Sequence, residues 1–320
     1  MAEGRQIRNG VAADWGLCDR EGMSMLALQG AYTALVTPFT EEGEVDLGAF
    51  EALVERQIAG GISGLVPCGT TGETPTLTDS EQIELVRRAV AVAAGRVPVI
   101  AGTGSFSTKK SIEASKRALE AGASAVMVVM PYYSKPTQEG LVQHMVAVAG
   151  ALGGAPVVLY NIPGRTGVDL GPEATERICE KATNVVAIKE ATGNVLRCQE
   201  LKRRLGDRLT VLSGDDGLTL PMMAVGASGV ISVSSNVYPG PVGEVVRLAL
   251  GGDFATARRK HLALLPVHDA MFLEANPGPV KAACAWKGWM RADVRLPLVA
   301  ASEGTRSRIE AILRAYEATL

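Results

Sequence analysis

Eight short runs of apolar and β-branched residues recur along the chain, and each leads into turn-forming or small polar residues such as Gly, Thr, Ser, Asp or Pro. The runs lack polar alternation, which is typical of strands covered on both faces and therefore of parallel sheets. They occupy residues 31–39, 64–69, 97–104, 125–133, 156–163, 185–192, 209–216 and 229–235.

The segments between these runs have helical periodicity. In residues 50–61, 80–95 and 109–122, apolar residues recur at i, i+3, i+4 and i+7, and glycine follows the last turn. Eight strand and helix units in about 220 residues match the length of one TIM barrel. The sequence therefore predicts an α/β fold, a (β/α)8 TIM barrel over residues 29–252.

A doubly wound nucleotide-binding sheet would also alternate strands and helices. GTGSFS (102–107) has the first two glycines of the dinucleotide fingerprint, but Ser107 stands where its last glycine belongs, and the segment follows the third strand instead of the first. A Walker-type phosphate loop is also missing from the sequence. These observations favour the barrel.

The strand pattern ends near Gly252, and the remaining residues, 253–320, predict a C-terminal three-helix appendage. We expect its helices near 253–274, 277–290 and 301–318. At the other end, residues 1–28 mix charged and apolar residues without the continuous apolar core of a secretory signal, so we expect a poorly ordered extension. Translation could start at Met1, Met23 or Met25.

Composition narrows the function. Net charge is -2 and no Lys/Arg block occurs, which argues against nucleic acid or an anionic membrane as a partner. The apolar stretches are shorter than the roughly 18 residues needed to span a bilayer. Five scattered cysteines without a C-x-x-C pair predict reduced thiols in the cytosol. Three unclustered histidines give no metal-binding pattern. A small-molecule substrate fits this composition best.

Lys189 is the main candidate for catalysis because it ends the apolar run 185–188. Barrel enzymes carry their catalytic groups at the carboxyl ends of strands, and strand alternation would turn this side chain into the barrel mouth. Burial lowers a lysine pKa from its ordinary value of about 10.4 by disfavouring the ammonium form. We therefore interpret Lys189 as a nucleophile for Schiff-base chemistry. The alternative is a lysine paired with Glu190 or a nearby aspartate.

Other strand ends supply hydroxyl groups. Tyr160 in VVLYNIP can act as a general acid and base, and Thr70 and Thr71 in GTTGE can offer hydroxyls and backbone N–H groups to a carboxylate. Tyr133 in PYY is a further hydroxyl at a strand end. Each of these residues alone could be a packed aromatic or a turn residue.

From about Leu28 to the C-terminus, the sequence resembles the dihydrodipicolinate synthase and N-acetylneuraminate lyase superfamily, and within it the dihydrodipicolinate synthases. The resemblance rests on eight motifs that occur in the family's order. They are VTPF (36–39), GTTGE (69–73), AGTG (101–104), PYY (131–133), YNIPGRTG (160–167), IKEATGN (188–194), SGDD (213–216) and GVISV (229–233).

The resemblance implies a role for each predicted site residue. Lys189 corresponds to the Schiff-base lysine, Tyr160 to the general acid and base, and Thr70 with Tyr133 to the rest of a proton relay. The pyruvate carboxylate site corresponds to Thr71 and the backbone of Ile231. In the synthases, an arginine at the position of Arg165 holds the carboxylate of the second substrate. A surface salt bridge is the structural alternative for Arg165.

The resemblance also implies the reaction and the assembly. Pyruvate would form an imine with Lys189, and the derived enamine would attack L-aspartate 4-semialdehyde in the diaminopimelate and lysine pathway, without a metal or organic cofactor. Family members are usually homotetramers in which the second tyrosine of PYY, here Tyr133, crosses a dimer interface. Two rivals are an aldolase of the same superfamily acting on 2-keto-3-deoxy sugar acids and a noncatalytic barrel.

One departure from the family concerns feedback inhibition. Lysine-inhibited members carry histidine, asparagine and glutamate groups along a cleft at the dimer interface. The aligned positions here are Asp79, Gln82, Phe106 and Lys110, while Tyr132 is kept. Lys110 would repel an ammonium group and Phe106 removes a polar anchor, so we expect weak or absent inhibition by lysine.

Overall fold

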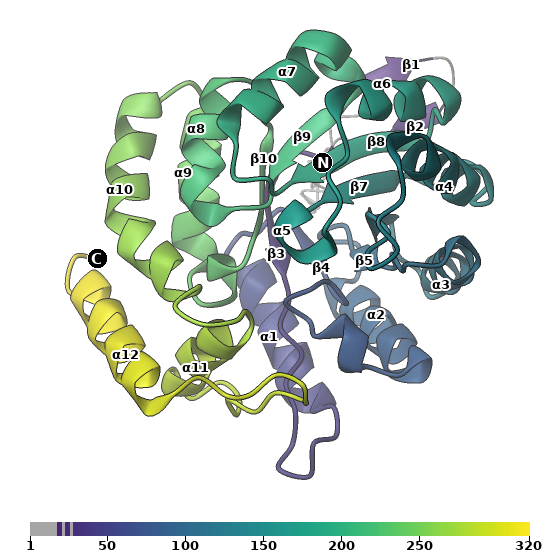
Figure 1. Ribbon diagram of the computed structural model, residues 1–320. Coiled ribbons are helices and arrows are strands. Elements are labelled where there is room, and N and C mark those ends of the chain that lie inside the picture. Colours follow the sequence, from purple (N-terminus) through teal and green to yellow (C-terminus); the bar gives the residue numbers. More distant parts are fainter. Residues whose placement is uncertain (1–17, 21–22, 26–27) are drawn as a thin grey trace, which may run out of the picture.

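Eight parallel strands form a barrel surrounded by helices in this computed structural model (Figure 1), which describes residues 18–20, 23–25 and 28–320. The strands are hydrogen-bonded in the order β4-β3-β10-β9-β8-β7-β6-β5, and a parallel bridge between Leu65 and Val99 joins the two ends of the sheet. The predicted TIM barrel is confirmed. Its strands are β3 (Gly30–Ala34), β4 (Gly64–Val66), β5 (Ile100–Gly102), β6 (Ala125–Val129), β7 (Val157–Asn161), β8 (Val185–Glu190), β9 (Thr210–Ser213) and β10 (Gly229–Ser232).

Helices follow the strands and cover the outside of the barrel (Figure 1). Their first turns carry side-chain caps where the sequence provides them; in α2, Thr78 and Glu81 form a reciprocal capping box. The α-helices around the barrel are α1 (Leu47–Ala59), α2 (Asp79–Ala93), α3 (Thr108–Glu120), α4 (Gln138–Gly150), α5 (Pro163–Thr166), α6 (Pro172–Lys181), α7 (Val195–Leu205), α8 (Thr219–Ala224) and α9 (Pro239–Leu250). The 3-10 turns are η1 (Thr74–Thr76), η2 (Gly206–Arg208), η3 (Asp216–Leu218) and η4 (Ser234–Asn236).

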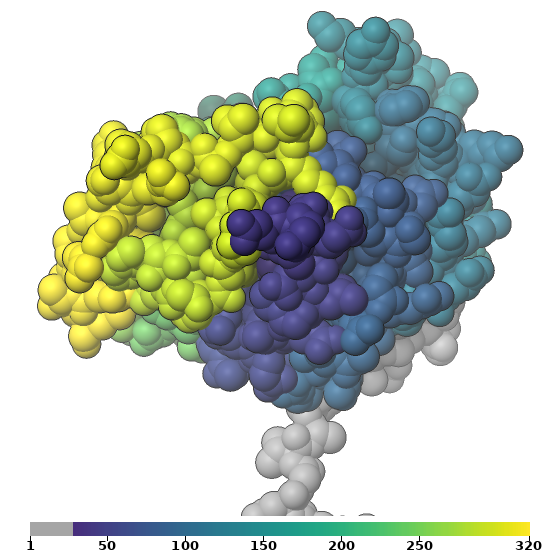
Figure 2. Space-filling view, turned by 90° about the horizontal axis from the view of Figure 1, so that it is seen from below, coloured from purple at the N-terminus to yellow at the C-terminus, as the bar shows by residue number. Residues whose placement is uncertain are grey.

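Three further helices come after the barrel: α10 (Phe254–Ala270), α11 (Gly278–Trp286) and α12 (Glu303–Glu317). They lie together on one side of the barrel, next to α9 and α1 (Figure 1). Figure 2 shows the C-terminal residues side by side with the purple residues that follow β3, where the Arg295 guanidinium donates to the Gly43 carbonyl. The C-terminal region is therefore packed against the barrel.

The predicted N-terminal extension, residues 1–28, falls mostly outside the described residues. Its described part holds two three-residue strands, β1 (Cys18–Arg20) and β2 (Met23–Met25), which pair in antiparallel register. Leu28 is buried and packs with the residues of the barrel interior.

The apolar core has two layers, as the unalternated strands require. One layer fills the barrel interior and includes Ala187, Ile231 and Val158. The larger layer lies between the strands and the helices and includes Ile188 and Val230. Neighbouring residues of one strand thus face opposite layers, which is the two-residue period of a strand.

A buried ion pair connects the C-terminal region to the loop after β4. The Lys281 ammonium of α11 lies 2.8 Å from the Glu73 carboxylate, and both side chains are fully buried. Lys281 also donates to the Thr37 carbonyl, and the backbone N–H of Arg295 donates to the second carboxylate oxygen of Glu73. Burial lowers the pKa of Lys281, and the Glu73 carboxylate opposes that shift. Both charges are therefore compensated within the protein.

Lys281→Met should lower the free energy of unfolding by about 3 to 5 kcal/mol, because it leaves the Glu73 carboxylate buried without a counter-charge. The double variant Glu73→Gln with Lys281→Met should recover part of this loss, because neither charge remains. Thermal unfolding followed by circular dichroism measures both. Lys109→Met, at an exposed ion pair, is the control and should keep the wild-type Tm. Equal Tm values for Lys281→Met and wild type would contradict the prediction.

Candidate active site

Lys189 lies in the barrel interior near the carboxyl end of β8, with 4% of its surface exposed. It pairs in register with Tyr160 on β7, and its Nζ lies 4.4 Å from the centroid of the Tyr160 ring. Gly214 leaves room for it, because a Cβ there would lie 3.2 Å from Lys189 Cε and 2.6 Å from the Ala191 side chain. The lysine side chain thus lies in a narrow space between the Tyr160 ring and the backbone of Gly214.

The alternative in which Lys189 is paired with Glu190 or an aspartate is wrong for the described part of the chain, where no carboxylate forms an ion pair with this lysine. Glu190 is the next residue of the strand and faces the outer layer. There it accepts hydrogen bonds from Asn161 Nδ2 and the Thr192 backbone N–H. Burial raises the pKa of Glu190, while these hydrogen bonds act in the opposite direction.

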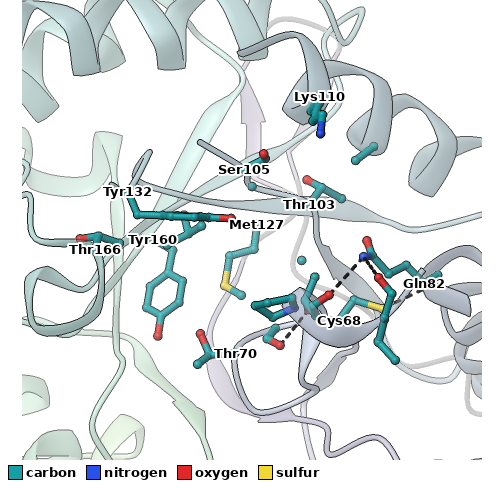
Figure 3. A pocket seen from close by; sticks show the side chains of 18 of the residues that line it. Cys68, Thr70, Gln82, Thr103, Ser105, Lys110, Met127, Tyr132, Tyr160 and Thr166 are labelled. Carbon is teal, nitrogen blue, oxygen red and sulfur yellow. Dashed lines mark hydrogen bonds between the residues drawn. The ribbon is translucent and has the colours of Figure 1, made fainter. Parts of the chain in front are cut away.

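A cavity of about 560 Å³ opens at the barrel mouth. Thr70 and Tyr160, predicted from the sequence, line it together with Met127 and Tyr132 (Figure 3). The predicted Arg165 is also a lining residue. The hydroxyls of Thr70 and Tyr160 form no hydrogen bond with each other or with another described residue. Two free hydroxyls at one cavity are available for proton exchange with a bound substrate.

Thr71 and Ile231 are buried, with 3% and 0% of their surfaces exposed, and like Lys189 they are not among the residues that line the cavity. Thr71 belongs to the loop between β4 and η1, and its Oγ1 accepts a hydrogen bond of 3.0 Å from Asn276 Nδ2. Ile231 lies on β10, one residue before Ser232. The Asp216 carboxylate fixes this strand end by accepting hydrogen bonds from the Ser232 hydroxyl and from the backbone N–H groups of the next two residues.

Arg165 is exposed on α5 at the rim of the cavity. The surface salt bridge considered as its structural alternative is not found among the described residues. Asn161 fixes the loop that carries Arg165: its side-chain oxygen accepts from Leu170 N–H, and its Nδ2 donates to Asp169. The guanidinium is therefore free to bind an anion at the entrance.

Tyr133 is not brought together with the other predicted residues. Its side chain is 91% exposed and its φ is +69°, an uncommon conformation for a residue with a Cβ. The preceding Tyr132 lines the cavity instead and packs edge-on against Phe106, with ring centroids 5.5 Å apart. Tyr133 therefore does not line the cavity of its own chain.

Three of the four positions aligned with the family's lysine-binding cleft line the same cavity, and the fourth, Phe106, packs against Tyr132. Asp79, Gln82 and Lys110 line it, and Lys110 Nζ is 5.7 Å from the centroid of the Phe106 ring. Arg117 forms an ion pair with Asp79. The expectation of weak inhibition by lysine stays a prediction.

Several residues that shape the site were missed from the sequence. Asn161, Asp216, Glu73, Asn276 and Lys281 are all buried and hydrogen-bonded around the strand ends. The first three stand within the motifs YNIPGRTG, SGDD and GTTGE, so their place in those motifs was the available signal. Lys281 lies within the predicted helix 277–290 and Asn276 directly before it, and neither belongs to a recognised motif.

The partial glycine fingerprint at residues 102–107 has a packing explanation. A Cβ on Gly102 would lie 2.1 Å from the Cys68 carbonyl oxygen, so this glycine allows two strand ends to approach closely. In the described ranges, 18–20, 23–25 and 28–320, no three His, Cys, Asp or Glu residues are grouped to hold a metal ion. No helix among these residues has both the length and the apolar character needed to cross a bilayer.

A buried lysine beside a tyrosine, at the carboxyl edge of a TIM barrel, is the arrangement expected of an enzyme that forms Schiff bases with carbonyl substrates. Comparison with known proteins is consistent with this class. A model of the Dihydrodipicolinate synthetase family matches residues 27–316. The chain belongs to the dihydrodipicolinate synthetase family.

Individual relatives and solved structures are similar along nearly the whole chain. The 4-hydroxy-tetrahydrodipicolinate synthase of Sorangium cellulosum (strain So ce56) is 66% identical over 297 residues, which cover 92% of this chain and 98% of that protein. The structure of the synthase of the same name from Methylacidiphilum fumariolicum SolV is 44% identical, with a TM-score of 0.90, and covers 92% of this chain and 97% of that one. A structure described as the first monomeric dihydrodipicolinate synthase variant is 41% identical, with a TM-score of 0.88 and coverage of 90% and 97%.

Proposed function

We propose that this chain catalyses the 4-hydroxy-tetrahydrodipicolinate synthase reaction, the condensation of pyruvate with L-aspartate 4-semialdehyde in diaminopimelate and lysine biosynthesis. The observation that carries the proposal is Lys189, 4% exposed and without an ionic partner among the described residues, beside Tyr160 at the carboxyl ends of β8 and β7. Relatives of this chain at up to 66% identity carry the same activity in their names. We also propose a cytoplasmic location for the reaction.

The reaction begins at Lys189. Its unprotonated amine attacks the keto carbon of pyruvate, and loss of water gives an imine. The imine nitrogen withdraws electrons, so a methyl proton of the bound pyruvate becomes acidic and its loss gives an enamine. The enamine carbon then attacks the aldehyde carbon of the second substrate. Finally, the amine of that substrate adds to the imine carbon and expels Lys189, which restores the enzyme.

The other site residues have matching roles in this proposal. Tyr160, whose ring lies beside Lys189, transfers protons to and from the departing water and the enamine, and Thr70, whose free hydroxyl lines the same cavity as Tyr160, takes part in this transfer once substrate is bound. Thr71 and the backbone at Ile231 bind the pyruvate carboxylate deep in the barrel. Arg165, at the rim, binds the carboxylate of L-aspartate 4-semialdehyde.

Borohydride reduction in the presence of pyruvate should give a covalent adduct that mass spectrometry maps to the peptide containing Lys189. Lys189→Met should form no adduct and should lose turnover by at least about a thousandfold, because no other amine replaces the nucleophile. Lys181→Met, on the exposed end of α6, is the matched control and should behave as wild type. Full turnover by the Lys189 variant would overturn the proposed function.

Arg165→Ala should raise the KM for L-aspartate 4-semialdehyde by about ten- to a hundredfold, the effect of losing a hydrogen bond to a charged group. Formation of the pyruvate imine should continue, because Arg165 lies at the rim and not beside Lys189. A coupled assay with the following reductase, run beside borohydride trapping, separates the two effects. An unchanged KM would contradict the role of Arg165, whereas no turnover of this aldehyde by the wild-type protein would favour the rival aldolase that acts on 2-keto-3-deoxy sugar acids.

We further propose that the chain assembles as a homotetramer, a dimer of dimers, in which Tyr133 completes the proton relay of the neighbouring subunit. The exposure of this side chain supports the idea, because a hydroxyl that projects away from its own cavity serves a relay only in a second copy. The monomeric variant among the structural neighbours makes a direct test necessary.

Mixing the inactive variants Tyr133→Phe and Lys189→Met should restore activity. If subunits pair at random, about half of the dimers contain one copy of each variant, and one of the two sites in such a dimer is complete. The expected activity is therefore up to about a quarter of the wild-type value. Restoration follows only if Tyr133 serves the partner's lysine. Sedimentation of each variant checks that assembly is unchanged. If the mixture is no more active after subunit exchange than each variant measured alone, the role of Tyr133 across the interface is contradicted.

A further inference from the structure

Two side chains of the C-terminal region hold the loop that carries Thr70 and Thr71. Asn276, just before α11, donates to the Thr71 hydroxyl at 3.0 Å, and Lys281, in the first turns of α11, binds Glu73 at 2.8 Å. These contacts join residues 205 and 208 positions apart in the sequence. The loop thus has its conformation fixed from outside the barrel.

The loop needs such support because of its backbone. It makes two consecutive tight turns, with N–H groups of Gly72 and Glu73 donating to the carbonyls of Gly69 and Thr70, and Glu73 has a φ of +56°. A positive φ is unfavourable for glutamate and persists only where surrounding contacts stabilise it. The buried ion pair supplies such a contact at this residue.

The direction of the Asn276 hydrogen bond sets the chemistry of Thr71. A hydroxyl has one hydrogen to donate and two lone pairs that can accept. Because Asn276 Nδ2 donates to Thr71 Oγ1, one lone pair is used; among the described residues the hydroxyl donates no hydrogen bond, and Asn276 Oδ1 accepts none. That hydrogen is available for a bound anion, to which a hydrogen bond is stronger than to a neutral group.

We propose that Asn276 is a positioning residue of the keto-acid site, which acts through Thr71 by keeping its hydroxyl a donor toward the pyruvate carboxylate. The inference rests on the proposed function, which assigns that carboxylate to Thr71. Asn276 is 5% exposed, and its side-chain amide donates to Thr71 Oγ1, so we assign its effect to that hydroxyl and not to a contact with the substrate. The C-terminal region is thereby part of the pyruvate site.

The test compares Asn276→Asp with Asn276→Ala. Asparagine and aspartate have almost the same size, but the introduced carboxylate accepts the Thr71 hydrogen and so removes it from the ligand. The half-saturating pyruvate concentration for borohydride trapping should rise about ten- to a hundredfold in Asn276→Asp and by less in Asn276→Ala, with the Arg165-dependent KM of the second substrate unchanged. Lowering the pH to protonate the new carboxyl should partly restore pyruvate binding.

A packing role gives the opposite order, with Asn276→Asp close to wild type and Asn276→Ala impaired, and that result would overturn the proposal. Asn184→Asp is the matched control, because Asn184 also donates to neighbouring groups, the carbonyls of Ala149 and Ala155, but lies away from the site. It should leave pyruvate binding unchanged. Asn184 is half-buried, so this control separates an effect on Thr71 from the general cost of placing a charge at a hydrogen-bonded asparagine.

Thr71→Val provides a second measurement that does not require the Asn276 variants to fold. It should weaken pyruvate binding as much as Asn276→Asp, and adding Asn276→Ala to it should cause no further loss, since the hydroxyl through which Asn276 acts is gone. Wild-type affinity in Thr71→Val would overturn the inference. A wild-type protein that forms no adduct at Lys189 would instead refute the proposed function, so the two failures are distinguishable.

Discussion

The site depends on the alternation of side chains along β8. Ala187 and Lys189 face the barrel interior, while Ile188 and Glu190 face the outer layer. A shift of one residue in the register of this strand would exchange them, placing a carboxylate in the barrel and the lysine under the helices. Because the strand is buried on both faces, packing of the apolar residues sets the register and therefore also the position of the amine.

The C-terminal region, which follows the barrel in sequence, stabilises the loop between β4 and η1. Asn276, Lys281 and Arg295 all bind the loop between β4 and η1, and the ion pair with Glu73 is fully buried. Burial makes such a pair sensitive to the loss of either partner. The helical region thus stabilises the loop conformation that places Thr70 at the cavity and Thr71 behind it.

The interior and the rim of the site differ in exposure. Lys189, Thr71 and Ile231 are buried and held by strands or by hydrogen bonds, whereas Arg165 is exposed on a short helix and Tyr133 projects into solvent. A buried interior suits a covalent intermediate, because its surroundings are fixed before the substrate binds. An exposed rim on loops suits selection of the second substrate and contact with another subunit.

The sequence by itself determined the barrel, the three helices after it and the candidate lysine, because unalternated apolar runs, helical periodicity and strand-end positions are local properties. It also identified Thr70, Tyr160 and Arg165, which line one cavity. It left open whether Lys189 pairs with Glu190, and it missed Asn161, Asp216 and Asn276. Only the tertiary structure decided these points, because a hydrogen bond between residues 205 positions apart depends on how the whole chain packs and leaves no periodic signal in the sequence.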